Sequence, residues 1–177
     1  MSYVIFALVL LALFHFVYES ILAPSFRMKL HFELCALRDE LRRLNWTRGR
    51  ELTRDYYAYL DEALLSLDSM LHRFDVGTLT AVRQELTRDP ELKRAVEQRG
   101  RTLDGCPVIE AIEIRERLLR IASRALLINH GAWCIYVFPS VFGRFGLGSA
   151  RILIRTAVSV PRSDLFRIAP NTAERGA

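Results

Sequence analysis

The chain has 177 residues, of which 51% are hydrophobic and 25% charged, with a formal net charge of +5 and a mean hydropathy of +0.12. It contains only 9 glycines and 6 prolines, so an unstructured chain and a collagen-like fibre are both excluded. A positive mean hydropathy beside so many charges indicates that the apolar residues are gathered into blocks. The length fits one domain of moderate size.

Positive and negative side chains alternate through the middle of the chain. Lys29 and Lys93 are its only lysines, so nearly all of the basic residues are arginines. Binding to nucleic acid requires a basic stripe that displaces counterions from phosphates. The alternation of both signs therefore argues against a nucleic-acid partner. The arginine-rich composition favours a bacterial protein.

The three cysteines, Cys35, Cys106 and Cys134, are far apart and form no C-x-x-C pair. This pattern argues against a disulfide framework or a zinc module and fits a reducing compartment. His31 precedes Cys35 by one helical turn, but a metal site needs at least three convergent ligands. We predict no metal and no cofactor.

The first apolar block covers residues 3–23 and reads YVIFALVLLALFHFVYESILA. As a helix these residues reach about 31 Å, close to the hydrocarbon thickness of a bilayer. Nothing basic precedes the block and no cleavage site of small residues follows it, so we predict an uncleaved transmembrane anchor over residues 1–24. The basic residues just beyond it predict an inner-membrane protein with a periplasmic N-terminus and a cytoplasmic main region. They are Arg27, Lys29, Arg38, Arg42 and Arg43.

A second apolar block, residues 125–143, has no charged residue. Asn129, His130 and Pro139 raise the cost of inserting it into lipid. Three interpretations stay open: a second span that places the C-terminus outside, a re-entrant or interfacial segment broken at Pro139, and a buried core helix.

Between the two blocks, leucines recur at alternating spacings of four and three, which is typical of the a/d seam of a coiled coil. The run covers only two heptads, so we expect it to pack on a neighbouring helix. A second helical stripe follows over residues 52–74, and together they predict an antiparallel hairpin over residues 26–74. We expect the seam to be buried against this second helix or against a copy in another subunit. The seam consists of Leu30, Leu34, Leu37, Leu41 and Leu44.

Further helices are predicted by their capping residues. Asp75 opens one helix, and Asp89 followed by Pro90 opens another, which Gly100 is expected to end. Residues 108–138 then predict one long helix that enters the bilayer. The predicted fold is all-α, divided into an anchor (1–24), a cytoplasmic helical bundle (25–107), a long helix plus an amphipathic segment (108–160) and a flexible tail (161–177).

Two groups of polar residues are candidate sites. Arg151 and Arg155 share a face of the amphipathic segment and are candidates for contact with anionic lipid, or for a helix packed on the core. The other group lies in the two apolar blocks, where ionisable groups are costly unless they pair or face water. It is either a polar cluster within the membrane or a set of interfacial residues. Its members are His15, Tyr18, Glu19, Asn129 and His130.

No catalytic constellation is recognisable, so the sequence favours a protein that acts by association with other proteins. We predict an assembly or accessory subunit of an inner-membrane complex, with lipid and a protein partner or a second copy as its contacts. One alternative is a membrane-active effector that oligomerises and disrupts the bilayer. Another is an enzyme or transport site at the intramembrane polar cluster.

Overall fold

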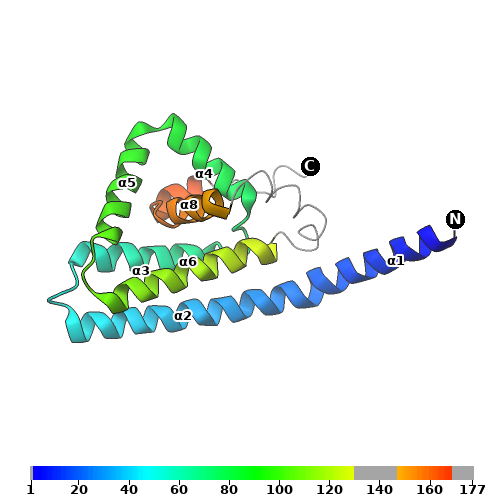
Figure 1. Cartoon of the computed structure of the whole chain (residues 1–177), viewed down its shortest axis with the longest axis horizontal. Helices are drawn as coiled ribbons and strands as arrows, with labels where there is room; N and C mark the ends of the chain where they lie inside the picture. The colour runs from blue at the N-terminus through cyan, green and yellow to red at the C-terminus, as the bar shows by residue number, and fades with distance from the viewer. Residues whose placement is uncertain (1, 130–146, 169–177) are drawn as a thin grey trace.

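A computed structural model describes residues 2–129 and 147–168, and every element in these two stretches is a helix. The all-α prediction is confirmed for this part of the chain. One long helix lies with its C-terminal half beside the remaining helices, and its N-terminal half extends away from them (Figure 1). The elements are α1 (Ser2–Val17), the π-helical turn η1 (Tyr18–Leu22), α2 (Ala23–Arg48), α3 (Arg54–Ser69), α4 (Val76–Arg88), α5 (Pro90–Asp104), α6 (Ile109–Asn129), α8 (Leu147–Val158) and α9 (Arg162–Ile168).

The long helix, Tyr3–Arg48, contains α1, η1 and α2 without interruption. Its N-terminal part is long and apolar enough to cross a membrane, and none of that part is buried against the rest of the protein. Its large apolar side chains are well exposed, for example Phe6 at 64%, Leu8 at 59% and Phe16 at 64%. Apolar surface of this extent on a helix is typical of a segment covered by lipid or by another protein.

The π turn explains how the helix continues through Pro24. Proline lacks an N–H group, and its ring crowds the carbonyl group four residues earlier, which breaks or bends an ordinary α-helix. Here the Ala23 N–H donates to the Tyr18 carbonyl, five residues back, and the Ser25 hydroxyl donates to the Ile21 carbonyl at 2.7 Å. The wider turn accommodates the proline, so the apolar N-terminal part and the part packed in the bundle form one continuous helix.

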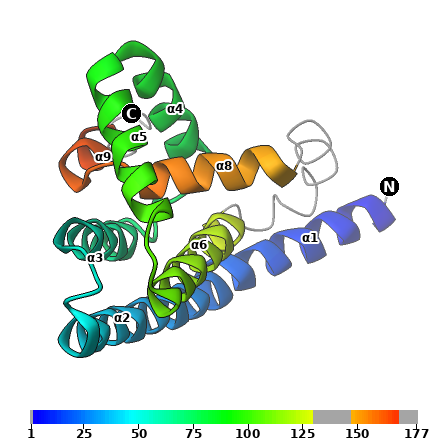
Figure 2. The same ribbon diagram turned by 60° about the vertical axis from the view of Figure 1, so that its left-hand side comes forward.

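The C-terminal half of this helix is packed. The five seam leucines of α2 are at most 8% exposed. α6 lies antiparallel beside α2 and is its most extensive neighbour, with α3 on another side (Figures 1 and 2). The seam is therefore covered within one chain, mainly by a helix that is distant in sequence.

Helices α4 and α5 begin at their expected capping residues. The Asp75 carboxylate accepts the Thr78 N–H at 2.7 Å, and Asp89 accepts two N–H groups in the first turn of α5. The prediction that Gly100 ends its helix is wrong, because α5 continues to Asp104. Buried Leu103 anchors this extra turn in the core, and a glycine inside a helix costs only about 1 kcal/mol.

The C-terminal helices return to the bundle. α8 packs against α4 and α6, and α9 packs against α3 and α4 (Figure 2). Ile154, Ala157 and Val160 are buried in these contacts, as is Leu165 of α9. The part of the second apolar block beyond α6, including Pro139, lies outside the described residues, as does Cys134.

Candidate functional site

A polar junction joins the start of α2 to the end of α6. The Arg27 guanidinium donates through Nε to the side-chain oxygen of Asn129 at 2.9 Å. The Asn129 amide nitrogen donates to the carbonyl groups of Leu71 and Phe74, at 2.7 and 3.0 Å. One asparagine thus fastens α2, α6 and the turn after α3 together. The sequence indicated Arg27 only as a charge that sets orientation, because its partner is 102 positions away.

Of the other residues predicted to form the polar cluster, Tyr18 lies nearest this junction. Its hydroxyl donates to the Ile128 carbonyl at 3.2 Å, across η1 and α6. His15 and Glu19 are exposed on the long helix, and His130 lies outside the described residues. The structure therefore brings Tyr18 and the end of α6 together at the level where the bare helix meets the bundle.

A row of ion pairs connects α2 to α6 along their shared length. Arg117 contacts Glu40 at 2.7 Å, and Arg124 contacts Glu33 at 3.3 Å. The two arginines are exposed, the two glutamates are partly buried, and all four side chains border a shallow groove of about 320 Å³. Exposed pairs of this kind contribute at most about 1 kcal/mol each, so they align the helices without forming an enclosed reaction site.

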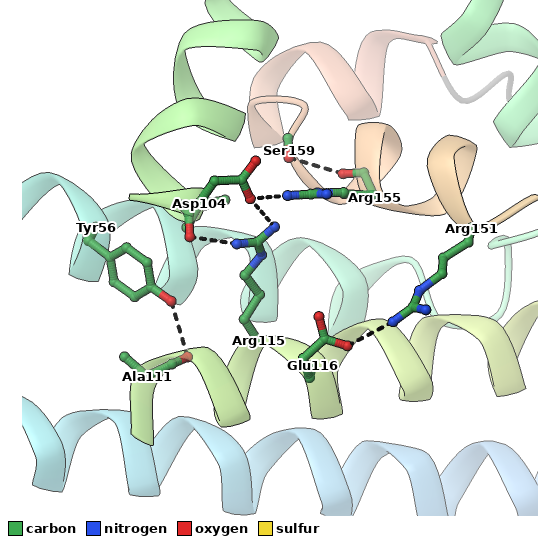
Figure 3. A network of polar contacts seen from close by, with 9 residues as sticks. Tyr56, Asp104, Ala111, Arg115, Glu116, Arg151, Arg155 and Ser159 are labelled. Atoms are coloured by element: carbon green, nitrogen blue, oxygen red, sulfur yellow. Dashed lines mark hydrogen bonds and ion pairs between the residues drawn. The ribbon is translucent and has the colours of Figure 1, made fainter. Parts of the chain in front are cut away.

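A second polar network fastens α5, α6 and α8 around Asp104 (Figure 3). The Asp104 carboxylate accepts hydrogen bonds from the guanidinium groups of Arg115, at 2.5 Å, and of Arg155. Arg115 also donates to the Leu103 carbonyl at 2.5 Å, and its side chain is only 11% exposed. One carboxylate therefore compensates two arginines from different helices.

The two arginines predicted to contact lipid both lie in contacts with the bundle. Arg155 binds Asp104, and Arg151 contacts Glu116 of α6 at 3.1 Å (Figure 3). The apolar face of α8 packs on the bundle, while Ile152 remains 66% exposed. The sequence showed this amphipathic face, but the face alone does not distinguish lipid from a protein core.

Tyr56 lies fully buried between α3 and α6, and its hydroxyl donates to the Ala111 carbonyl at 3.1 Å (Figure 3). Burial raises the pKa of this hydroxyl well above its usual range, and the neighbouring Cys106 adds to the increase. The group is a neutral hydrogen-bond donor at physiological pH. Its contact is structural, because it ends on a backbone carbonyl.

His31 and Cys35 are neighbours on α2, with 3.8 Å between the Cys35 sulfur and His31 Nε2. The other ring nitrogen lies 2.5 Å from an Asp68 carboxylate oxygen on α3. Among residues 2–129 and 147–168, no three histidine, cysteine or acidic side chains are arranged to hold a metal ion.

An open groove of about 580 Å³ lies between α4, α5 and α8. Its walls combine aliphatic side chains, such as Val82 and Val96, with Arg83 and Lys93. No histidine, cysteine or aspartate lines it, so its described walls offer no histidine base and no thiol nucleophile.

Comparisons with protein-family models, with curated proteins and with solved structures find no match to this chain. Its main features are a bare apolar helix, a bundle continuous with it, and a polar junction where the two meet.

Proposed function

We propose that the chain is a membrane-anchored helical protein that acts by binding other proteins, as an assembly or accessory subunit of an inner-membrane complex. The observation that carries the proposal is the contrast within the long helix, whose N-terminal part has no burial while α2 is packed in the bundle. A rigid connection of this kind holds a folded bundle at a fixed height above a membrane.

The length of the bare segment supports insertion. Residues 3–22 reach about 30 Å as a helix, which matches the hydrocarbon thickness of a bilayer. Arg27 and Lys29 follow directly, and basic residues next to a span favour the cytoplasmic side. The bundle is then cytoplasmic and the N-terminus periplasmic.

Exposed apolar residues at the opposite end of the bundle support a role in binding. Trp46, in the last turn of α2, is 90% exposed, and Ile109, at the start of α6, is 68% exposed. The ion pair between Arg48 and Glu110, at 3.0 Å, holds these two helix ends together. Tryptophan is enriched among the residues that dominate protein interfaces, so this end is the surface we assign to a protein partner.

Anchoring is tested by alkaline extraction of membranes from cells that make the full chain. We expect the protein to stay in the membrane pellet, and Leu10→Arg with Leu13→Arg to release it, since each central arginine costs about 3 kcal/mol. Leu10→Ala with Leu13→Ala is the matched control and should remain in the pellet. Release of the unmodified chain would overturn the proposed anchoring.

The partner surface is tested in cells with a photo-crosslinking amino acid. Placed at Trp46, it should give a discrete adduct with another protein. Placed at Arg101, an 81% exposed side chain on α5, it should give none. Equal labelling from both positions would contradict the assignment of the partner surface.

A further inference from the structure

A shallow hollow lies beside the turn that joins α3 to α4. It encloses about 200 Å³ and is lined by Ser69, Met70, His72, Arg73 and Phe166 of α9. Met70 is almost fully buried, whereas His72 and Arg73 are exposed and Phe166 is 45% exposed. The hollow therefore combines apolar surface with two side chains that donate hydrogen bonds.

Two guanidinium groups belong to this hollow or its edge. Arg73 lines it, and the Arg162 guanidinium lies over the Phe166 ring, 5.5 Å from the ring centroid. The carboxylates on either side of the turn, Asp68 and Asp75, have other contacts. Asp68 lies 2.5 Å from a histidine of α2, and Asp75 accepts an N–H in the first turn of α4. Guanidinium groups match the oxygens of a phosphate group, so the charge of the hollow suits this anion.

The hollow lies at the height of the lipid headgroups if α1 crosses the membrane. Arg27 is five positions beyond Leu22, the last residue of η1, which corresponds to about 7.5 Å along the helix. The headgroup layer outside the hydrocarbon is about 5–8 Å thick. Asn129 binds both Arg27 and two carbonyl groups of residues 71–74, so this turn is fixed near the same height. Figure 1 shows the end of α6 on the side of the bundle from which α1 extends.

We infer that this hollow binds the phosphate group of an anionic phospholipid in the membrane that holds the anchor. The inference rests on the proposed anchoring, because an inserted α1 is what brings the hollow to headgroup height. His72 and Arg73 donate to the phosphate oxygens, and the exposed Phe166 ring contacts carbon atoms next to the headgroup. A free phosphate ion offers the same oxygens, but it has no carbon atoms and is not held at this height.

This contact gives the bundle a second attachment to the membrane. A single helix leaves the bundle free to turn about the axis of that helix, whereas a lipid bound beside α3 determines which side faces the bilayer. Trp46, on the proposed partner surface, is 24 positions beyond Leu22, about 36 Å along the helix. The bound lipid therefore fixes the direction in which this distant surface points.

Lipid binding is tested by native mass spectrometry of the full chain in a non-ionic detergent. Phosphatidylglycerol should bind more tightly than phosphatidylcholine. Arg73→Gln should weaken the binding of phosphatidylglycerol about fivefold, the effect of losing one basic residue near anionic lipid. Arg101→Gln, the same change at an 81% exposed side chain on α5, is the control and should leave the affinity unchanged. Equal affinities of the two variants would overturn the inference.

A second variant tests the hollow from the other side. Arg162→Gln removes the guanidinium group above Phe166 and should also weaken the binding of phosphatidylglycerol. Because both arginines are exposed, neither substitution should lower the thermal unfolding temperature of the bundle. If Arg73→Gln does lower it, Arg162→Gln decides the question, and full affinity in that variant contradicts the lipid site.

Two further measurements test the source and the height of the phosphate group. Inorganic phosphate at the concentration of the lipid should not displace phosphatidylglycerol, and displacement would assign the hollow to a free ion. In vesicles, a lipid with a nitroxide on its headgroup should quench a fluorescent probe attached to Val76→Cys more strongly than one attached to Arg101→Cys. Both chains carry serine in place of the three native cysteines. Equal quenching would contradict the proposed height.

Alkaline extraction of membranes separates this inference from the anchoring. A chain that stays in the membrane pellet but binds phosphatidylglycerol and phosphatidylcholine equally leaves the anchoring intact and removes the lipid site. Release of the unmodified chain contradicts both proposals, because the hollow then has no headgroup beside it.

Discussion

The two halves of the helix Tyr3–Arg48 have the same backbone geometry and opposite surfaces. α1 exposes apolar side chains on every side, including Leu8 and Leu13 at 59% and 58%. α2 gathers its apolar residues mainly at seam spacing, with charged residues at many other positions. Leucine content alone does not distinguish the two halves. The angular distribution of leucines does, because a protein core covers one face of a helix and a lipid phase covers all faces.

The change between the two halves occurs within a few residues. Ala23, which has no exposed surface, is the first buried residue of the helix and directly follows η1. Tyr18 and Arg27, on either side of it, both contact the end of α6. The end of α6 therefore contacts the long helix at the position where its apolar side chains become confined to one face.

The largest expected effect comes from removing leucine side chains in each half. Leu41→Ala should lower the free energy of unfolding of the bundle by about 2–5 kcal/mol, since Leu41 is fully buried. Leu13→Ala, the same change on the bare half, should alter it by less than about 0.5 kcal/mol. Urea unfolding of both variants in the same detergent checks this. Equal losses of unfolding free energy in the two variants would contradict the distinction between a packed and a bare half of the helix.

An intermediate effect on the free energy of unfolding is expected where α5, α6 and α8 meet. The packed half of the long helix belongs to a bundle that is held together there by residues distant in sequence. Asp104→Asn removes the charged partner of Arg115, whose side chain is 11% exposed, and of Arg155. We expect a loss of about 1–3 kcal/mol, since a largely buried guanidinium loses its charge compensation. Glu97→Gln, which affects an exposed pair with Arg101 at 3.9 Å, is the control and should cost less than about 0.5 kcal/mol. Similar losses in both variants would contradict the role of the Asp104 network.

Local patterns in the sequence predicted much of this fold. The caps at Asp75 and Asp89 lie where their side chains predicted them, because capping is a contact over two or three positions. The spacing of the seam leucines predicted the buried face of α2. Heptad spacing does not specify which helix covers that face.

Distant partners account for most of what the sequence did not predict. Glu116 of α6 contacts Arg151 of α8, which lies 35 positions away. Arg155, one of the two arginines that bind Asp104, lies 51 positions from it, and Asn129 and Arg27 are separated by 102 positions. Rules for side chains one turn apart do not reach such pairs, which depend on how the helices are assembled.

The smallest expected effect concerns Tyr56, and it tests the packed bundle through pH. Tyr56→Phe removes one buried hydrogen bond to the Ala111 carbonyl, so we expect a loss of about 1 kcal/mol near pH 8. Tyr59→Phe, at a partly buried position on the same helix, is the control for losing one tyrosine hydroxyl and should cost less.

The difference between Tyr56→Phe and the unmodified chain should change with alkalinity. In the unfolded chain a tyrosine ionises near pH 10, whereas burial raises the pKa of Tyr56 in the folded chain. Above pH 10 the unfolded state therefore binds fewer protons than the native state, and the native state of the unmodified chain loses stability with rising pH. This one group contributes a slope of up to about 1.4 kcal/mol per pH unit. Tyr56→Phe lacks that slope, so its deficit at pH 8 should shrink and then reverse between pH 10 and 12 in urea unfolding experiments. A deficit that stays constant over this range would mean that water reaches the hydroxyl, and that the contact between α3 and α6 is looser than the buried seam beside it.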